Sequence, residues 1–383
     1  MNVGLIGVGR LGLAYALCFE EAGFNVIASS YKKDYVDALS LKKTDSVEPG
    51  IAEMLYKSKN IQFTTDNHQV IDQCDIVYVL VATPSNQDGS YDVSAVIQVA
   101  QDYVNHPNSI ENKILIIGST VNPGTTDQVE KMLSHRGVHV VYSPTFSAQG
   151  EVLKTIQDPH TISIGTTNTQ VAEQCKKIFS VICKDTTPIY VMQPMTGEIL
   201  KLAGNCRATI NIAFANMIGQ ILIDSGLADD LKVATEYLSF IKLQVKWKFG
   251  YGYGGPCYPR DNRSFIHYTK SIGLDYNLGE LIDNFNQSHV EYLTDYFIKN
   301  NVNNLPYYFE YVSYKKGVNI FEESHQLQVC KNLLRRGAKV FVEPSKFLLP
   351  LIQQELTEEF ANVDFVSFDK LSKQDIFVYN VSI

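Results

Sequence analysis

The residue types best suited to chemistry gather in one short stretch, residues 249–261, in which four of the six residues 250–255 are glycines. Because glycine destabilises helices and strands, the stretch is predicted to form a loop whose backbone approaches a ligand closely. Its end carries Cys257, followed by Arg260 and Asp261. A thiolate is a strong nucleophile and a nearby carboxylate transfers protons, so Cys257 is the candidate nucleophile. A surface loop with an incidental cysteine is the alternative.

A second set of polar residues, Glu198, Lys201 and Asn205, is spaced by three and four along a predicted helix. This helix is expected to follow Pro194, with Thr196 as its N-cap, and to run to about residue 225. So long a helix usually connects domains or packs against a partner subunit. Lys201 and Asn205 are suited to hold a substrate oxygen. A solvent-exposed polar face is the alternative.

Two elements at the start of the chain predict the kind of cofactor that this chemistry uses. Residues 3–6 read as a buried strand, followed by G-x-G-x-x-G and an apolar helical run to residue 22. This order is typical of dinucleotide binding: the glycines allow a tight turn and a close pyrophosphate, and the helix N-terminus holds the phosphates. The residues expected to contact the cofactor here are Gly7, Gly9, Arg10, Leu11 and Gly12.

The end of the second strand, residues 25–28, lacks the carboxylate that usually binds the adenosine ribose. Ser30, Lys32 and Lys33 stand near that position, and they remove the repulsion that a carboxylate exerts on a 2′-phosphate. We therefore expect NAD as the cofactor with NADP also tolerated. In the alternative, Asp34 or a backbone group takes the role and NAD alone is preferred.

Further strands are predicted at residues 61–64, 75–81, 113–118, 138–142, 161–165 and 189–191. Their alternation with helices predicts a doubly wound, mostly parallel sheet. Ligands bind at the carboxyl ends of such strands, so loops with Thr83, Pro84 and Thr120 are expected to line the cofactor cleft. Ordinary turns are the alternative. Beyond the glycine loop, helices are predicted at 278–286, 289–298 and 324–336, and strands at 308–312, 338–343, 363–365 and 375–379.

Composition limits the class of function. With 383 residues the chain should form two or three domains, and its net charge of -8 argues against nucleic-acid or anionic-membrane partners. The seven cysteines show no metal-like spacing, so we expect no metal site and reduced thiols in a cytoplasm. The first residues enter an apolar strand at once, and no apolar run is long enough to span a bilayer, so neither a signal peptide nor a membrane span is expected.

Taken together, these motifs resemble the UDP-glucose/GDP-mannose dehydrogenase family over nearly the whole chain. The resemblance rests on the N-terminal fingerprint, Thr83-Pro84 with residues 88–92, residues 119–125, the Glu198–Lys201–Asn205 face, and Gly252-Tyr253-Gly254-Gly255-Pro256-Cys257 with Asp261. It implies an N-terminal Rossmann-type domain (1–193), a central helical dimerisation region with the cysteine loop (194–295), and a smaller Rossmann-like domain for the nucleotide sugar (296–383). A homodimer is implied as well.

The resemblance further implies oxidation of a sugar C6 alcohol to a carboxylate, with two NAD⁺ consumed and UDP-glucose as the first choice of substrate. Cys257 would attack the intermediate aldehyde, and water would cleave the resulting thioester. Lys201 and Asn205 would stabilise oxyanion character, and Asp261 would assist proton transfer with a water near Thr120. The residues expected to contact the substrate are Phe146, Gln149, Lys201, Asn205, Phe249, Tyr251, Tyr253 and Gly254.

Three segments of this chain depart from the family pattern. The family's Ser-Pro-Glu-Phe-Leu-x-Glu-Gly is Ser143-Pro144-Thr145-Phe146-Ser147-Ala148-Gln149-Gly150 here, so both carboxylates are absent. The usual Asp-Pro-Arg-Ile-Gly before the glycine loop is replaced by residues 239–243, and of Asp-x-Arg-Glu-Ser only Glu323-Ser324 remains. GDP-mannose, a UDP-N-acetylhexosamine or another nucleotide sugar are alternative substrates. A hydroxyacid dehydrogenase, or a nucleotide-sugar-binding protein that has lost catalysis, are alternative classes.

Overall fold

The computed structural model describes residues 1–184, 186–240, 250–271, 278–372, 374 and 376–378. The chain divides into two compact units, Met1–Leu202 and Ala203–Ile383. Among the described residues, no helix is long and apolar enough to cross a membrane.

In the first unit, the described residues form one eight-stranded sheet in the order β3-β2-β1-β4-β5-β6-β7-β8. The strands are β1 (Asn2–Ile6), β2 (Asn25–Ser29), β3 (Ile61–Thr64), β4 (Ile76–Val79), β5 (Ile114–Ile117), β6 (His139–Tyr142), β7 (Ile162–Gly165) and β8 (Ile189–Met192). Neighbouring strands are parallel except β6 and β7, which are antiparallel. The predicted doubly wound, mostly parallel sheet is confirmed.

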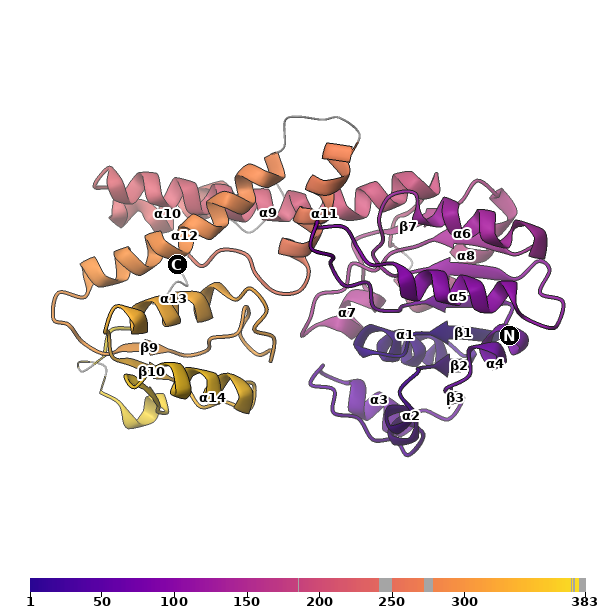
Figure 1. The fold of residues 1–383 in the computed structure, drawn as a ribbon, viewed down its shortest axis with the longest axis horizontal. Coiled ribbons are helices and arrows are strands. Elements are labelled where there is room, and N and C mark those ends of the chain that lie inside the picture. The colour runs from indigo at the N-terminus through magenta and orange to yellow at the C-terminus, as the bar shows by residue number, and fades with distance from the viewer. Residues whose placement is uncertain (185, 241–249, 272–277, 373, 375, 379–383) are drawn as a thin grey trace. The chain divides into compact units, whose positions relative to one another are not determined.

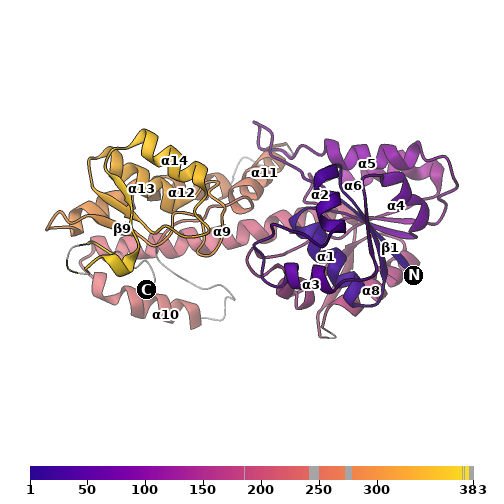
Figure 2. The same ribbon diagram turned by 90° about the horizontal axis from the view of Figure 1, so that it is seen from below.

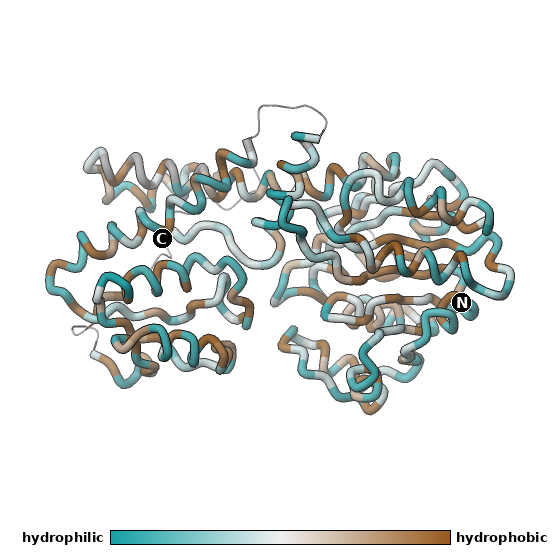
Figure 3. The backbone as a smooth tube through the Cα atoms, viewed as in Figure 1, coloured by the Kyte–Doolittle hydropathy of each residue, from teal (hydrophilic) through white to brown (hydrophobic). Residues whose placement is uncertain are grey.

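Helices cover both faces of this sheet, with α4 and α5 on one side and α1, α3 and α8 on the other (Figure 2). The helices are α1 (Arg10–Glu21), α2 (Lys33–Ser40), α3 (Ile51–Lys57), α4 (Asn67–Gln73), α5 (Ser94–Val104), α6 (Thr125–Leu133), α7 (Val152–Gln157) and α8 (Thr169–Ile182), with a 3-10 turn at Ser134–Arg136. Because side chains alternate along a strand, Ile76 and Tyr78 of β4 join one apolar core while Val77 and Val79 join the other. Strands buried on both faces read as continuous apolar runs, which appear brown in Figure 3.

The second unit contains a smaller parallel sheet in the order β11-β10-β9 (Figure 1). Its strands are β9 (Tyr307–Phe309), β10 (Val340–Val342) and β11 (Val363–Phe365). The helices are α9 (Pro194–Asp224), whose first residues belong to the first unit, α10 (Leu231–Phe240), α11 (Tyr258–Ser271), α12 (Leu278–Asn300), α13 (His325–Arg335) and α14 (Pro350–Glu359), with 3-10 turns at Ala228–Asp230 and Phe368–Lys370. Apolar side chains of α12, α13 and α14 pack with this sheet in one core.

Three predictions of local structure need correction. The long helix α9 starts at Pro194, so Thr196 lies within its first turn and is not its N-cap. The two helices expected at 278–298 are one, α12, since no glycine or proline interrupts residues 280–300. The strand expected at 375–379 lies partly outside the described residues. In its described part, Phe377 forms only a single parallel bridge, with Tyr307.

Candidate active site

The three glycines of the fingerprint turn have three different environments. Gly7 has a φ of +98°, and an added Cβ would lie 2.6 Å from the carbonyl carbon of Leu80. A Cβ on Gly12 would lie 2.3 Å from the carbonyl oxygen of Gly7, so this residue lets α1 pack against the turn. Gly9 differs, since no described atom lies within 4 Å of its added Cβ. An open space therefore adjoins the first turn of α1, as a bound pyrophosphate requires.

Helix α1 begins at this open space. Gly9 is its N-cap, and among the described residues no side chain caps it, so first-turn N–H groups can bind an anion. Arg10 is exposed and donates from Nη1 to Gln149 Oε1 at 2.9 Å, while Leu11 is half-buried. The strand order changes direction between β1 and β4, and dinucleotides bind at such a switch point. These residues fit the diphosphate of NAD.

At the end of β2 the two candidate lysines are in different situations. Lys33 Nζ forms a 2.6 Å ion pair with Asp37, one turn further along α2. Lys32 lies with its ammonium 5.7 Å from the ring centroid of Tyr31, and it forms no ion pair within the described part of the chain. Ser30 is buried and its hydroxyl oxygen is 3.5 Å from the Lys32 backbone N–H. Lys32 is therefore the cation better placed to meet a 2′-phosphate.

The loops that follow β4 and β5 are tied to each other. The Thr83 hydroxyl donates to the carbonyl oxygen of Thr120 at 2.7 Å, and the Ser119 hydroxyl donates to that of Val81 at 2.7 Å. Thr83 is buried, whereas Pro84 is exposed and Thr120 is half-buried. Both loops lie at the carboxyl ends of strands next to the fingerprint turn, where they were predicted.

Glu198 of α9 is a buried structural group. Its carboxylate accepts hydrogen bonds from the Gly124 N–H at 2.6 Å, the Thr126 N–H at 2.8 Å and the Thr126 hydroxyl at 2.5 Å. Burial raises the pKa of this carboxyl, against the effect of these hydrogen bonds. The carboxylate thus joins α9 to the start of α6, which excludes the alternative of a solvent-exposed face at this position.

Lys201, one turn further along α9, is also buried. Its ammonium lies 4.4 Å from the ring centroid of Phe146, close enough for a cation–π interaction. Phe146 itself is 43% exposed, an unusual position for a large apolar side chain. The structure therefore brings together Lys201, Phe146 and, through the same loop, Gln149 within the first unit.

A buried carboxylate that the sequence did not point out supports this loop. Glu48 is 5% exposed and accepts hydrogen bonds from the N–H groups of Gly150, at 2.8 and 3.0 Å, and of Val152, at 3.5 Å. Gly150 follows the substituted segment directly, and Val152 starts α7. Glu48 thus holds the end of the segment in place.

In the second unit, two buried histidines hold the backbone of the glycine loop. His289 Nε2 lies 2.7 Å from the carbonyl oxygen of Gly250 and must donate to it, while His325 Nδ1 accepts from the Gly252 N–H at 2.9 Å. Both rings are neutral in these roles. Burial lowers the pKa of His289 to about 4, and burial together with the nearby His289 lowers that of His325 to about 3.

Two buried asparagines complete the support of the loop. The Gly250 N–H donates to Asn216 Oδ1 at 2.9 Å. Asn286 bonds both backbone groups of Tyr253, accepting from its N–H at 3.0 Å and donating to its carbonyl at 2.9 Å. A Cβ on Gly252 would lie 2.1 Å from Asn286 Oδ1, so only glycine fits there. Buried polar side chains therefore hold the backbone of the glycine loop at Gly250, Gly252 and Tyr253.

These histidines predict a loss of stability in acid. An unfolded histidine titrates near pH 6.5, whereas His289 stays neutral in the fold until about pH 4. Stability from this residue is complete above about pH 6.5 and is lost as the pH falls towards 4, by about 3 kcal/mol. Urea unfolding at pH 7, 5.5 and 4 measures it. The variant His289→Gln keeps a hydrogen-bond donor for the Gly250 carbonyl but cannot titrate, so its loss of unfolding free energy between pH 7 and 4 should be smaller by about 3 kcal/mol. Equal losses in the two proteins would show that His289 is not the titrating group.

Cys257 is half-buried and stands at the N-terminus of the 14-residue helix α11, since its carbonyl accepts from the Asp261 N–H at 2.8 Å. Asp261 is 1% exposed, and burial raises the pKa of its carboxyl well above the usual range. Asn205 Nδ2 donates to that carboxylate, while Arg260 Nε lies 3.7 Å from it. The Cys257 thiol, the buried Asp261 carboxyl and the Asn205 amide thus lie in the same unit.

The remaining predicted substrate residues have mixed positions. Tyr251 packs edge-on against Phe297, with ring centroids 6.4 Å apart. Tyr253 is buried, and its hydroxyl donates to Asp283 at 3.2 Å. Phe249 lies outside the described residues. Their contacts with a substrate stay predictions.

Sequence reasoning missed the polar residues of α12. Asp283, Asn286 and His289 recur every three residues on a helix that is otherwise partly apolar, and all three are buried. That periodic polar stripe was the available signal, because buried polar groups in a helix need partners. No group of three histidine, cysteine or acidic residues able to hold a metal ion occurs among the residues that the structure describes.

Comparison with known proteins agrees with this geometry. Residues 1–183 match the model of the NAD-binding domain of the UDP-glucose/GDP-mannose dehydrogenase family, and residues 195–288 match its central domain. The chain belongs to this family. The predicted resemblance is therefore confirmed, as is NAD as the cofactor, because the fingerprint turn lies within the NAD-binding domain.

Individual relatives are distant. UDP-glucose 6-dehydrogenase of Pseudomonas aeruginosa is 24% identical over 363 residues, which cover 89% of this chain and 78% of that protein. An uncharacterized protein of Methanocaldococcus jannaschii is 27% identical over 283 residues, which cover 71% of this chain but only 31% of that protein.

Solved structures share the fold of this family member. A UDP-glucose dehydrogenase from Pyrobaculum islandicum superposes with a TM-score of 0.84 at 23% identity, over 96% of this chain and 86% of that chain. A UDP-D-ManNAc dehydrogenase from Pyrococcus horikoshii gives a TM-score of 0.78 at 19% identity, over 99% and 88%. Both likenesses confirm the predicted fold class: an N-terminal Rossmann-type unit, a long helix and a smaller α/β unit.

Proposed function

We propose that this protein is a nucleotide-sugar 6-dehydrogenase that oxidises the C6 alcohol of UDP-glucose to a carboxylate. One observation carries the proposal: Cys257 stands at the start of α11, one turn from a buried Asp261 that accepts a hydrogen bond from Asn205. A dehydrogenase that stops at an aldehyde or ketone needs no thiol. A thiol beside a proton-transferring carboxyl is what further oxidation to an acid requires.

In the proposed reaction, NAD⁺ held at the fingerprint turn would supply the hydride acceptor for two successive oxidations of the sugar. After the first, Cys257 Sγ forms a bond to the aldehyde carbon, and the aldehyde oxygen takes a proton to give a thiohemiacetal. Loss of the hydride and of that proton gives a thioester, and water then cleaves the C–S bond, releasing the acid and the thiol. Lys201 and Asn205 stabilise negative charge on the oxygen, and Asp261 carries protons with a water held near Thr120.

Two observations support UDP-glucose as the substrate. Phe146, which lies over the Lys201 ammonium, is typical of the glucose-specific members that the motif resembles. Relatives such as the P. aeruginosa protein carry the name UDP-glucose 6-dehydrogenase. GDP-mannose and UDP-N-acetylhexosamines are the alternative substrates.

A panel of nucleotide sugars with NAD⁺, monitored by absorbance of the reduced nicotinamide, tests the proposal. UDP-glucose should give two reduced cofactors per sugar and a uronate product. Two equivalents with another nucleotide sugar would change the substrate and keep the reaction. One equivalent per molecule, or activity with a hydroxyacid, would contradict the reaction itself.

A second candidate function is nucleotide-sugar binding without turnover. The observation that favours it is the replacement of both loop carboxylates by Thr145 and Gln149, of which Gln149 is bonded to Arg10. In that case calorimetry would detect binding of a nucleotide sugar, while no reduced nicotinamide would form in the panel.

The cofactor prediction follows from the environments of the two lysines. We expect kcat/KM with NADP⁺ to lie within about a hundredfold of that with NAD⁺, because no carboxylate repels the 2′-phosphate and Lys32 can bind it. Lys32→Ala should lower the NADP⁺ value alone by about tenfold, as loss of a charge-assisted hydrogen bond predicts. Lys33→Ala is the matched control, since Lys33 is already paired with Asp37. Discrimination of several hundredfold in the unmodified protein would contradict the prediction.

We also propose a homodimer built on the central helices. On α10, Val233, Tyr237 and Phe240 are 64%, 67% and 86% exposed, more apolar surface than one short helix usually leaves in water. Sedimentation analysis should give twice the chain mass, and Tyr237→Glu should shift it towards the monomer.

A further inference from the structure

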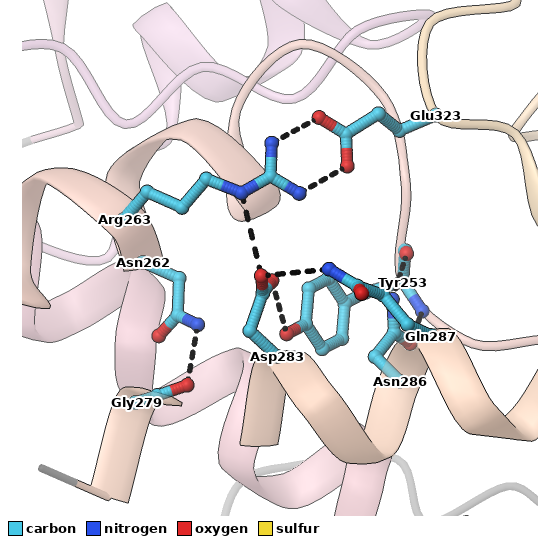
Figure 4. Close-up of polar contacts among 8 residues, drawn as sticks. All are labelled: Tyr253, Asn262, Arg263, Gly279, Asp283, Asn286, Gln287 and Glu323. Atoms are coloured by element: carbon cyan, nitrogen blue, oxygen red, sulfur yellow. Dashed lines mark hydrogen bonds and ion pairs between the residues drawn. The ribbon is translucent and has the colours of Figure 1, made fainter. Parts of the chain in front are cut away.

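Arg263 connects two carboxylates from distant parts of the second unit. It lies on α11, six residues after Cys257. Its two terminal nitrogens donate to the two oxygens of Glu323 at 2.5 and 2.7 Å, and its Nε donates to Asp283 Oδ2 at 3.3 Å (Figure 4). Such a bidentate pair fixes the direction of both side chains as well as their separation.

The Asp283 carboxylate and the backbone of residues 322–323 also contact the glycine loop. Asp283 accepts from the Tyr253 hydroxyl at 3.2 Å (Figure 4). On the other side, the Gly255 N–H donates to the carbonyl oxygen of Glu322 at 2.9 Å, and a Cβ on Gly254 would lie 2.2 Å from the carbonyl oxygen of Glu323. Arg263 therefore closes a ring of contacts that runs from the glycine loop through α12 to α11 and back through residues 322–323.

The backbone of Glu323 is adapted to this contact. Its φ is +46°, in the left-handed region that residues other than glycine rarely adopt. Ser324, which follows it, caps α13 by accepting from the Leu327 N–H at 3.2 Å. Such a conformation persists when its surroundings hold it, and here the side chain is held by Arg263 while the carbonyl meets the glycine loop.

Stability alone is a weak reason for this arrangement. The side chains of Arg263 and Glu323 are 38% and 37% exposed, and ion pairs at that exposure contribute little to folding. The ring does fix geometry: Arg263 lies on the helix that follows Cys257 and is joined through Asp283 to Tyr253 of the loop that precedes it.

We propose that Arg263 is a positioning residue: by clamping Asp283 and Glu323 it sets the first turn of α11, and with it the Cys257 thiol and Asp261, against the glycine loop. The inference rests on the proposed function, in which Cys257 is the nucleophile. A displacement of a reacting group by about 1 Å can cost about a hundredfold in rate, so the clamp acts on the rate of covalent bond formation more than on substrate affinity.

Three variants test this. Arg263→Met removes the clamp, and Arg263→Lys restores a single charge contact. Arg336→Met is the matched control, because Arg336 is also 38% exposed and also pairs with two carboxylates, Glu291 and Asp295. Among the described residues, neither of these ion pairs involves the glycine loop. Thermal unfolding is measured for all three, so that a loss of stability is known separately.

The first readout is independent of catalysis: the rate at which iodoacetamide alkylates Cys257, followed from pH 6 to 9 by peptide mass spectrometry. Arg263→Met should change this rate about tenfold, Arg263→Lys should recover part of the change, and Arg336→Met should match the unmodified protein. The second readout is turnover, where Arg263→Met should lower kcat by at least about tenfold with KM nearly constant.

Equal alkylation profiles for Arg263→Met and Arg336→Met would overturn the proposal. If Arg263→Met does not fold, Glu323→Gln, which keeps the size of the side chain, takes its place in both readouts with the same expected outcome. If the unmodified protein oxidises no nucleotide sugar, the proposed function fails, while the alkylation profiles still decide whether Arg263 positions the thiol.

Discussion

Replacing Cys257 with serine is expected to lower the rate of carboxylate formation by a factor on the order of 10⁴, as loss of a covalent nucleophile does. A serine hydroxyl at neutral pH is a far weaker nucleophile than the sulfur of cysteine. Cys257 is not among the residues expected to contact the cofactor, so the dissociation constant of NADH should change by less than about twofold. Uronate formation and NADH fluorescence measure the two effects.

The chain offers a matched control for this substitution. Cys183 is the other half-buried cysteine among the described residues, and its thiol donates to the carbonyl oxygen of Ile156 far from the glycine loop in sequence. Cys183→Ser should leave both readouts unchanged. Uronate formation at the unmodified rate in Cys257→Ser would show that the proposed covalent mechanism is wrong.

The second large effect concerns release of the acid from Cys257. Hydrolysis of a thioester needs an activated water, and a positioned carboxylate base contributes about 10²–10⁴-fold. Thr145 and Gln149 orient water but accept no proton at neutral pH. Two carboxylates nearby have other partners: Glu48 accepts hydrogen bonds from backbone N–H groups, and Glu151 is exposed and pairs with Lys154 at 3.7 Å.

We therefore expect a burst of reduced cofactor followed by slow turnover, with the sugar acid held on Cys257. Intact-protein mass spectrometry shortly after mixing should detect the adduct. Thr145→Glu should shorten its lifetime by about 10²–10⁴-fold because it adds a base. Thr145→Gln is the control, since it adds similar length without a base. Linear turnover with no adduct would mean that another group, such as Asp261, activates the water.

The sequence by itself determined the features that depend on local pattern. The G-x-G-x-x-G pattern between a strand and a helix specifies a tight turn. Glycine at position 7 allows a left-handed backbone, and glycine at position 12 allows the helix to pack closely against the turn. Apolar runs of four or five residues separated by amphipathic helices specify a doubly wound sheet, because each strand is buried on both faces. Cys257 was identifiable for the same local reason, as the cysteine next to a run of glycines.

Other features were decided only by the tertiary structure, because they depend on which distant segments meet. Nothing local to Asn205 or Asp261 indicates that residues 56 positions apart share a hydrogen bond, or that burial raises the pKa of that carboxyl. Arg263 and Glu323, 60 positions apart, read as surface charges in the sequence. The neutral state of His289 arises from burial against the carbonyl of Gly250. Periodicity reports which side of an element is apolar, but the partner of a polar group is set by the packing of whole helices against one another.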